Sequence, residues 1–306
     1  MTKIEKILKN RRLTLALTGL TPEKFIELLP DFAKAWEQDL QQRYRKDKNR
    51  NRKPGGGSIG FLRTVETKMF YALFYFKCYP TFDVLSFLYN CNRSNACRRQ
   101  QHCSRILEKA LGRKLVLPER KIDSVEKFFQ MFPGIKDIFI DGTERPIRRP
   151  KDHDLQKQHY SGKKKRHTKK NLVITDKGKR VRFLGKTTAG SKHDFTLLKE
   201  SGVPNYIPKK VRSNLDLGFL GFGKEYPGHP YSMPKKKPKG QELSDADRKR
   251  NKGKSRSRVV VENALAGVKR LRIVSDVFRN VKKNFDDQVM FIACGLWNYH
   301  LSPARV

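Results

Sequence analysis

Two aspartates stand at the ends of stretches that are expected to be strands, and one glutamate lies in an apolar helix further along the chain. Asp141 closes the run IKDIFID, Asp216 closes the apolar part of KKVRSNLDLGF, and Glu262 stands in VVVENALAGVKR. If the helix packs on a sheet that contains both strands, the three side chains offer only oxygen atoms, which favours Mg²⁺ or Mn²⁺. Two such ions about 3.5 to 4 Å apart assist displacement at a phosphodiester. A single aspartate at a strand end is usually a turn former or a helix cap, so that alternative stays open.

The neighbours of Glu262 indicate how its charge is balanced. At about 100° per residue, Arg258, Glu262 and Lys269 fall in one stripe of the expected helix. The rest of its circumference is apolar: Val260, Val261, Ala264, Leu265, Val268 and Leu271. We therefore expect a mostly buried helix with one polar stripe. Because a lone buried carboxylate is costly, Glu262 must face a cation of its own helix or a metal ion shared with other acids.

The composition indicates the class of partner. The chain has a formal net charge of +38 over 306 residues, so it attracts polyanions, and nucleic acid is the first candidate. An apolar fraction of 37%, with 19 Phe and 10 Tyr, exceeds that of a disordered basic tail and allows a buried core. The length suggests about two domains. A basic RNA-binding or structural protein stays open as an alternative class.

The cysteines and the apolar runs indicate the compartment. No two of the five cysteines have the close spacing of a structural zinc site: Cys78, Cys91, Cys97, Cys103 and Cys294. We expect buried or incidental thiols in a reducing compartment. The longest apolar run, MFYALFYF, is too short to span a bilayer, and MTKIEKILKNRR lacks the apolar part of a signal peptide. A soluble protein is expected.

The first 50 residues are expected to be helical. Thr21 can cap a helix that begins at Pro22, and a second helical run covers residues 36–44. The charged, glycine-rich stretch RKDKNRNRKPGGGSIG, which begins at Arg45, indicates a break, with a linker over residues 51–60.

Residues 61–130 are expected to form a helical DNA-binding region. Three helices are predicted over FLRTVETKMFYALFYFKCY, TFDVLSFLYN and RSNACRRQQHCSRILEKALG, and the short turn Cys91-Asn92 joins the last two. This is the outline of a helix-turn-helix, whose second helix would enter the major groove. The side chains outside its inward face suit base edges and phosphates: Arg98, Arg99, Gln101, His102 and Arg105. A solvated helix face that contacts nothing is the alternative.

After one more helix over SVEKFFQMF, the pattern becomes extended. The strands NLVIT and VRFLGKTTA are joined by the hairpin turn Asp176-Lys177-Gly178, and a helix starts near His193 or Asp194. Residues 221–256 predict a basic insertion with little regular structure. Two helices, SRVVVENALAGVKRLRI and KNFDDQVMFIACGLWNYHLS, close the chain. The fold class expected for residues 131–306 is α/β (α+β), a mixed sheet flanked by helices, preceded by an all-α region.

Five motifs follow one another between about Ile135 and Trp297: FIDGTERPIRRP, HYSGKKKRHTKKN, GSKHDFTLL, LDLGF and VVVENALAGVKR. Their order resembles the nuclease domain of DDE transposases, and more narrowly the bacterial insertion-sequence transposases of family five and Harbinger-like elements. The resemblance implies a ribonuclease H-like fold. It implies that Asp141, Asp216 and Glu262 are catalytic and bind two Mg²⁺ ions, for which Mn²⁺ can substitute. The implied activity is cleavage at the ends of the element and strand transfer into target DNA.

The resemblance also implies DNA contacts beside these acids. Relatives of such transposases carry Tyr, Arg, Glu and Lys at fixed spacings, and this sequence keeps Arg258, Glu262 and Lys269 but has Ser255 where Tyr would stand. Arg258 and Lys269 would hold phosphates, whereas a tyrosine-dependent step is not implied. A basic run is expected to track the DNA backbone, with a nuclear-targeting or solvated stretch as the alternative: Lys163, Lys164, Lys165, Arg166 and His167. Further candidates near the site are Glu144, His193 and Asp194.

The implied partner is double-stranded DNA, as terminal inverted repeats and as target, with no membrane. A homodimer or larger assembly is expected, because two ends must be paired. The expected location is the cytoplasm, at a bacterial nucleoid, with a nucleus as the alternative. A host-adopted DNA-binding protein or nuclease without transposition activity is the alternative function.

Overall fold

The computed structural model describes residues 4–46 and 60–303, so the linker predicted over 51–60 lies, except for its last residue, outside the described residues. The chain divides into two compact units. The helical unit consists of Met1–Leu117, Arg270–Asp276 and Asn298–Val306. The sheet unit consists of Pro118–Lys269 and Val277–Trp297. The domain limits expected from the sequence stay a prediction.

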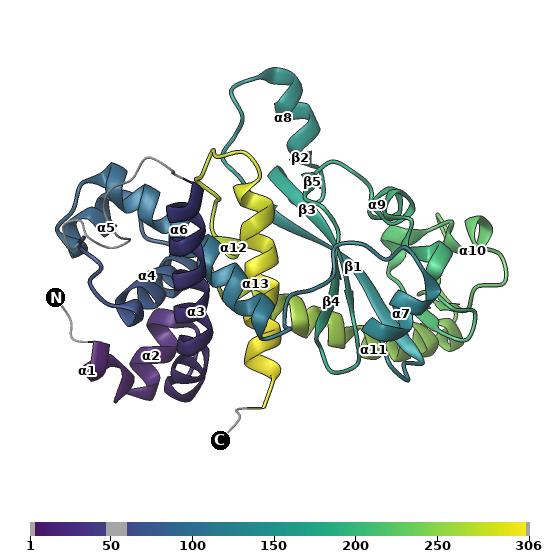
Figure 1. Ribbon diagram of the computed structural model, residues 1–306. Helices are drawn as coiled ribbons and strands as arrows, with labels where there is room; N and C mark the ends of the chain where they lie inside the picture. The colour runs from purple at the N-terminus through teal and green to yellow at the C-terminus, as the bar shows by residue number, and fades with distance from the viewer. Residues whose placement is uncertain (1–3, 47–59, 304–306) are drawn as a thin grey trace. The chain divides into compact units, whose positions relative to one another are not determined.

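Over residues 4–46 and 60–117, the helices of the helical unit are (Figure 1): α1 (Ile4–Leu8), α2 (Arg11–Thr18), α3 (Pro22–Lys46), α4 (Val65–Cys78), α5 (Phe82–Tyr89) and α6 (Arg93–Arg113). α12 (Arg272–Ser275) and the last residues of α13 (Phe285–Leu301) also belong to it. Its core is aromatic, with Phe25, Phe32, Tyr71 and Phe76 fully buried.

The prediction of two helical runs before residue 46 is wrong, because α3 is one helix of 25 residues with Pro30 inside it. Proline removes a backbone donor and normally interrupts a helix. Here buried residues recur with helical spacing on both sides of Pro30, among them Phe25, Leu28 and Phe32. Burial of this stripe stabilises the helix across the proline.

The three helices predicted between residues 61 and 112 are confirmed as α4, α5 and α6. The side chain of Thr81 caps α5 by accepting a hydrogen bond from the amide of Val84. Asn90 ends α5 in the left-handed conformation (φ 46°), and Asn92 is the N-cap residue of α6. The short turn between α5 and α6 gives the predicted helix-turn-helix.

The sheet unit is built on a mixed sheet: β1 (Asp137–Pro146), β2 (Tyr160–Ser161), β3 (Arg166–Thr175), β4 (Val181–Leu184), β5 (Thr188–Ala189), β6 (Arg212–Asn214) and β7 (Tyr231–Ser232). The order is β2-β3-β1-β6-β7, and β4 and β5 also pair with β3. β1 is antiparallel to β3 and parallel to β6, which is parallel to β7. The predicted hairpin after NLVIT is confirmed by the antiparallel pair β3 and β4. The expected mixed α/β class is therefore found.

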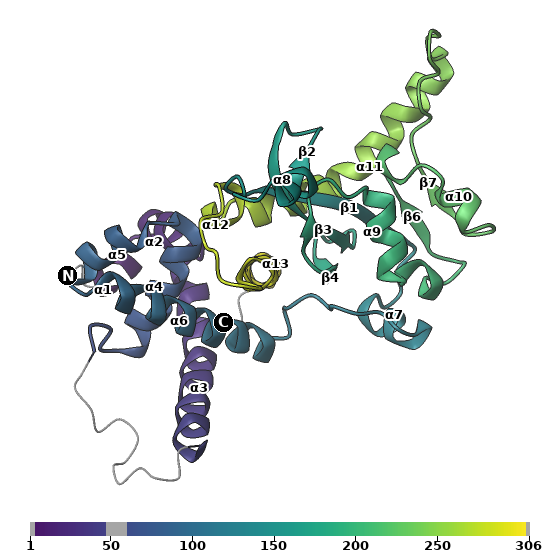
Figure 2. The ribbon, with the colours of Figure 1, turned by 90° about the horizontal axis from the view of Figure 1, so that it is seen from above.

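Alternating residues of β1 face opposite sides of the sheet. Ile138 and Ile140 join a buried cluster with Phe128 of α7 (Val125–Met131) and Leu198 of α9 (Asp194–Ser201). The other side is covered by α11 (Asp245–Lys269), whose first turns extend past the sheet in Figure 2. The remaining short elements are α8 (His153–His159), α10 (Phe222–Glu225) and the 3₁₀ turns Val203–Tyr206 and Leu217–Phe219.

Several predicted boundaries in this unit are wrong. β1 does not end at Asp141 but continues to Pro146, because Gly142 to Pro146 remain paired with β3. β3 begins at Arg166, inside the basic run, since pairing with β1 and β2 outweighs the polar composition of this stretch. The region 221–256 holds α10, β7 and the start of α11 instead of little regular structure. The following helix ends at Lys269, and α12 is separate.

The thiols and the membrane prediction can be assessed over the described residues. All five cysteines are free, with Cys103 and Cys294 buried and the other three half-buried, as expected for incidental thiols. Between residues 4–46 and 60–303, no helix combines the length and the apolar character that crossing a membrane requires.

Candidate active site

Asp141 lies on β1 just beyond the part of the strand that pairs with β6. The parallel pairing ends at Phe139, whereas the antiparallel pairing with β3 continues, with Asp141 opposite Val173. Its carboxylate accepts a hydrogen bond of 2.8 Å from the amide of Gly142. Burial, and next the nearby charge of Asp216, raise the pKa of Asp141 to about 6. The negative charge of Asp141 is therefore poorly compensated by the protein itself.

Asp216 follows β6 after one intervening residue. Its side chain caps the 3₁₀ turn Leu217–Phe219 by accepting a hydrogen bond of 2.7 Å from the amide of Gly218. Because β1 and β6 are parallel neighbours, both aspartates lie toward the carboxyl ends of their paired segments, at the same edge of the sheet. The expectation that the two strands are adjacent is confirmed.

Glu262 lies on α11, and the expected burial of its helix is wrong. Its side chain is 57% exposed, because α11 buries one stripe against the sheet unit and leaves the opposite stripe in solvent. The buried stripe contains Val261, Ala264, Leu265 and Val268. The guanidinium of Arg258 lies 3.8 Å from the carboxylates of both Asp216 and Glu262. These two carboxylates are therefore separated by no more than twice that distance, with a cation between them.

The oxygen donors of these acids suit a hard divalent cation, but the three side chains do not all point to one position. Asp141 and Asp216 present oxygen atoms that repel one another, which is the environment that such a cation neutralises. Within residues 4–46 and 60–303, no three acidic, histidine or cysteine side chains converge closely enough to hold one ion together. The guanidinium of Arg258 is within 3.8 Å of both Glu262 and Asp216.

A second group of charges lies next to the aspartates. A Cβ atom on Gly142 would overlap the carboxylate of Asp194, and a Cβ atom on Gly218 would lie 2.8 Å from it and 2.9 Å from Asp216. The two glycines thus leave room for Asp194 between the segments that carry Asp141 and Asp216. His193 is the N-cap residue of α9 without a side-chain cap bond.

The buried ammonium of Lys170 holds this second group together. It lies 3.0 Å from Asp194 and 3.4 Å from Glu144, and it donates to the carbonyl of Lys192 at 2.8 Å. In the sequence, Lys170 stands out only as one of several cations in the motif HYSGKKKRHTKKN. The register between β1 and β3 sets Glu144 opposite Lys170, so a correct prediction of that register would have identified the pair.

Two further cations approach the acids. Burial, and then the charge of Lys164, lower the pKa of Lys269, and Asp141 and Glu144 oppose that shift. Lys269, at the end of α11, therefore lies near these carboxylates, and Lys164, in the turn before β3, lies near Lys269. The other predicted backbone contacts, Lys163, Lys165 and Arg166, are exposed, whereas His167 is half-buried on β3.

The helix-turn-helix presents a basic groove of about 800 Å³. Among the described residues that line it none is acidic, and they include Arg43, Arg98, Arg99, Gln101 and Arg105. The four candidates on α6 thus share one concave surface in the helical unit. Their charge is compatible with the DNA contact that the sequence predicts.

His102, which was expected to point outward with these residues, is buried, and that expectation is wrong. Its ring bonds the carboxylate of Asp39 on α3 at 2.8 Å and lies 4.5 Å from the ring of Trp36. Burial lowers the pKa of His102, although the hydrogen bond with Asp39 opposes this shift. The residue fastens α6 to α3 and, although it is buried, it also lines the basic groove.

Family models and a relative match most of this chain. Residues 140–298, which contain all three predicted acids, match the family model described as DDE superfamily endonuclease. Residues 61–113 match the model described as helix-turn-helix of DDE superfamily endonuclease. The chain is 31% identical over 258 residues to a probable transposase for the insertion sequence element IS702 of Microchaete diplosiphon, covering 84% of this chain and 87% of that protein. No solved structure matches the chain. The chain belongs to the DDE superfamily endonucleases.

Proposed function

We propose that this protein is a DNA transposase, which cuts DNA at the ends of a mobile element and joins those ends to target DNA. The observation that carries the proposal is the meeting of Asp141 and Asp216 at one sheet edge, beside Arg258, within a DDE endonuclease. A helix-turn-helix of the same family and a relative named as a probable transposase support it. The strand order, with β1 between antiparallel β3 and parallel β6, supports a ribonuclease H-like fold.

Membership of this family implies the use of a divalent metal, and we assign Mg²⁺, in two sites, with Mn²⁺ as a substitute. Asp141, Asp216 and Glu262 are the residues proposed to hold it. When bound, such ions lower the pKa of an attacking hydroxyl and stabilise the leaving oxygen of a phosphodiester. Arg258, which now lies between Asp216 and Glu262, is proposed to turn to a phosphate of the DNA.

The remaining predicted residues are assigned to DNA. Lys269, which lies near Asp141, and Lys164, which lies near Lys269, are proposed to contact phosphates next to the cut. Lys163, Lys165, Arg166 and His167 would track the backbone further along. Arg98, Arg99, Gln101 and Arg105 on α6 are proposed to read terminal inverted repeats in the major groove. A dimer or larger assembly, which pairs two ends, completes the proposal.

A nicking assay tests the function. A duplex that carries the inverted repeats flanking the coding region is incubated with the protein and Mg²⁺, and the broken strand is mapped. The wild-type protein is expected to cut at the end of the repeat, and Asp216→Asn to lose more than about 100-fold of the rate, because a ligand of the metal is removed. Binding of the same duplex should persist in the variant. Binding without cutting by the wild-type protein would instead indicate a host-adopted DNA-binding protein.

The helix-turn-helix assignment is tested separately by base preference. Gln101→Ala is expected to reduce discrimination among variants of the repeat by about 1 to 3 kcal/mol at one base pair. Binding to unrelated duplex should change little. Equal weakening on all duplexes would instead assign Gln101 to the backbone.

A further inference from the structure

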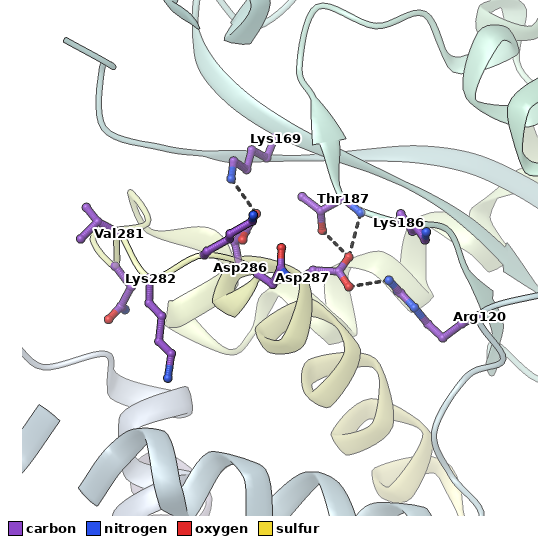
Figure 3. Close-up of a pocket in the computed structure, with 11 residues that line it drawn as sticks. Arg120, Lys169, Lys186, Thr187, Val281, Lys282, Asp286 and Asp287 are labelled. Atoms are coloured by element: carbon purple, nitrogen blue, oxygen red, sulfur yellow. Dashed lines mark hydrogen bonds and ion pairs between the residues drawn. The ribbon is translucent and has the colours of Figure 1, made fainter. Parts of the chain in front are cut away.

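The sheet unit contains a second basic cavity, which includes none of the predicted acids and shares only Lys169 with the sequence motifs. Its volume is about 520 Å³, and it lies between β3, the segment after β4 and the loop that leads into α13 (Figure 3). Five cations line it against two carboxylates, and the principal residues are Lys169, Lys186, Lys282, Lys283, Asp286 and Asp287. We call it the lysine pocket.

Both carboxylates of the lysine pocket are already neutralised. Asp286 accepts from Lys169 at 2.8 Å. Asp287 accepts from Arg120 at 2.5 Å and from the amide and hydroxyl of Thr187, each at 2.8 Å (Figure 3). Both acids also stand in the first turn of α13, where negative charge is favourable. Neither acid is left to repel an anion that enters the pocket.

A fully buried cation lies beneath these residues. Arg145 of β1 donates to the carbonyl of Asp286 at 2.9 Å, to Asn171 at 3.1 Å and to Thr187 at 3.2 Å. Among the bonds described for it, none goes to a carboxylate, and its Nε atom has no hydrogen-bond partner. A buried guanidinium bonded only to neutral oxygens adds positive potential to the floor of the pocket.

The rim supplies further positive charge. Lys186 and Lys283 are exposed, and no ion pair involves either of them within the described parts of the chain. Their charge is therefore available to a ligand. Val281, also at the rim, is 94% exposed and offers an apolar surface beside these cations.

The sheet places the lysine pocket on the same face as Asp141. Asp141 and Arg145 are four residues apart on β1, so their side chains point to one side, and Lys169 is directly opposite Arg145. At about 3.3 Å per residue, the pocket begins roughly 13 Å from Asp141. Phosphates of one DNA strand advance about 3.4 Å each along the helix axis, so this separation corresponds to about four nucleotides.

We propose that the lysine pocket binds the phosphodiester backbone of DNA about four nucleotides from the bond cut at Asp141. The inference rests on the proposed function, and it adds a second anchoring point for the reacting strand. The backbone can belong to the end of the element or to the target, and both present the same chemistry to the pocket. The backbone contact itself requires neither metal nor the catalytic acids.

The salt dependence of DNA binding tests this proposal without catalysis. In EDTA, the logarithm of the affinity falls with the logarithm of the salt concentration by about 0.9 for each phosphate contact. Lys186→Gln with Lys283→Gln is expected to reduce that slope by about 2. When the salt concentration rises fourfold, the double variant is therefore expected to lose about tenfold less affinity than the wild-type protein. The control is Lys209→Gln with Lys210→Gln, which removes the same charge from another exposed segment of the same unit. The proposal is overturned if both pairs change the slope equally.

A charge added at the rim gives an independent test. Val281→Glu places a carboxylate beside the lysines and is expected to weaken DNA binding at low salt, whereas the neutral Val281→Gln should not. Because Val281 is 94% exposed, neither change is expected to alter the melting temperature. Equal effects of Glu and Gln would contradict a phosphate site.

Backbone footprinting separates the two sources of DNA. On a duplex with the flanking inverted repeats and on one of unrelated sequence, the protected positions are compared between the wild-type protein and the lysine double variant. Loss of protection about four nucleotides from the cut on the first duplex assigns the pocket to the end of the element. Loss on the second assigns it to the target, and loss on neither overturns the proposal. A wild-type protein that never cuts would refute the proposed function. The difference in footprint between the wild-type protein and the double variant would still test whether the lysine pocket contacts DNA.

Discussion

Asp141 is expected to lower the stability of the metal-free protein, because its carboxyl is held where ionisation is unfavourable. Its pKa is raised to about 6, from 3.8 in an unperturbed aspartate, first by burial and then by Asp216. Above pH 6 the native state therefore holds a costly charge, and stability rises as the pH falls from about 6 toward 4. Asp141→Asn should raise the free energy of unfolding by about 3 kcal/mol at pH 8, and by little below pH 4.

Chemical denaturation in EDTA at several pH values measures this effect. Mg²⁺ should then stabilise the wild-type protein and not Asp141→Asn, because the ion binds the native carboxylates. A variant that is less stable at pH 8 would show that Asp141 is structurally compensated by groups such as Arg258.

Some residues of the candidate site could be predicted from the sequence, and others could not. Asp141 could be identified because it follows a short apolar run, and Asp216 because the motif LDLGF stands in its expected order; strand polarity then brings the two together. Asp194 was a candidate from its place in the sequence, but its contact with Lys170 could not be predicted, because it depends on the register between β1 and β3 and on space left by Gly142. The exposure of Glu262 was missed because valine and alanine occur on the solvent side of α11 as well as on its buried side.

Among the elements, α11 carries Glu262 and Arg258, so its docking determines where they lie. Gly267 packs against the ring of Trp297, and the ring is fixed by a hydrogen bond of 2.8 Å to the carbonyl of Lys179. A Cβ atom at Gly267 would overlap the ring. Gly267→Ala should therefore destabilise the sheet unit by about 1 to 2 kcal/mol, because overpacking outweighs the helix propensity of alanine.

The matched control is Gly253→Ala on the exposed part of the same helix, where a Cβ atom meets nothing within 4 Å. This change should stabilise the protein by up to about 1 kcal/mol. Thermal melting of both variants gives the comparison. A stabilising effect at both positions would refute the close packing of α11 on Trp297.

Pro30 lowers the stability of α3, because it lies inside the helix. Pro30 is exposed, so its replacement removes no core contact, and a backbone donor is regained. Pro30→Ala should stabilise the helical unit by about 1 to 3 kcal/mol. Pro22→Ala at the first helical position should have little effect, since no donor is needed there. Circular dichroism melts test the pair, and a loss of stability in Pro30→Ala would indicate that the ring is required.

Element types were largely predictable, whereas the ends of strands and of α11 were not. The helices α4 to α6 were found because apolar spacing and capping residues agree. β3 was expected to begin later, because RHTKK is polar and its pairing with β1 leaves no local signal. The first half of α11 was expected to be irregular, because its lysines and arginines lie on no apolar stripe.

At the scale of the whole molecule, the charge of +38 is spread over both units. The helical unit offers the basic groove along α6, and the sheet unit offers the acids, the cations near them and the lysine pocket. Overall DNA affinity should therefore depend strongly on salt, whereas sequence preference should come from α6 alone. This arrangement could not be derived from composition, because net charge does not reveal which cations pair internally.

The helical unit is built from three separate segments of the chain. Residues 270–276 and 298–303 belong to it, although residues 118–269 of the sheet unit precede both segments in the chain. They bury Ile273, Val274 and Tyr299, and Tyr299 donates a hydrogen bond of 2.9 Å to the carbonyl of Lys24. Burial of three such side chains contributes about 5 kcal/mol or more, which is comparable with the stability of a small domain.

A fragment that ends at residue 117 should therefore melt far below the helical unit of the 306-residue chain, although it contains all six helices from α1 to α6. Helix content measured by circular dichroism during heating compares the two proteins. Tyr299→Phe in the 306-residue chain is the matched control and should cost only about 1 kcal/mol, because the ring stays buried and one hydrogen bond is lost. If the fragment melts as high as the helical unit of the intact chain, the returning segments do not stabilise that unit, and α1 to α6 form an autonomous domain.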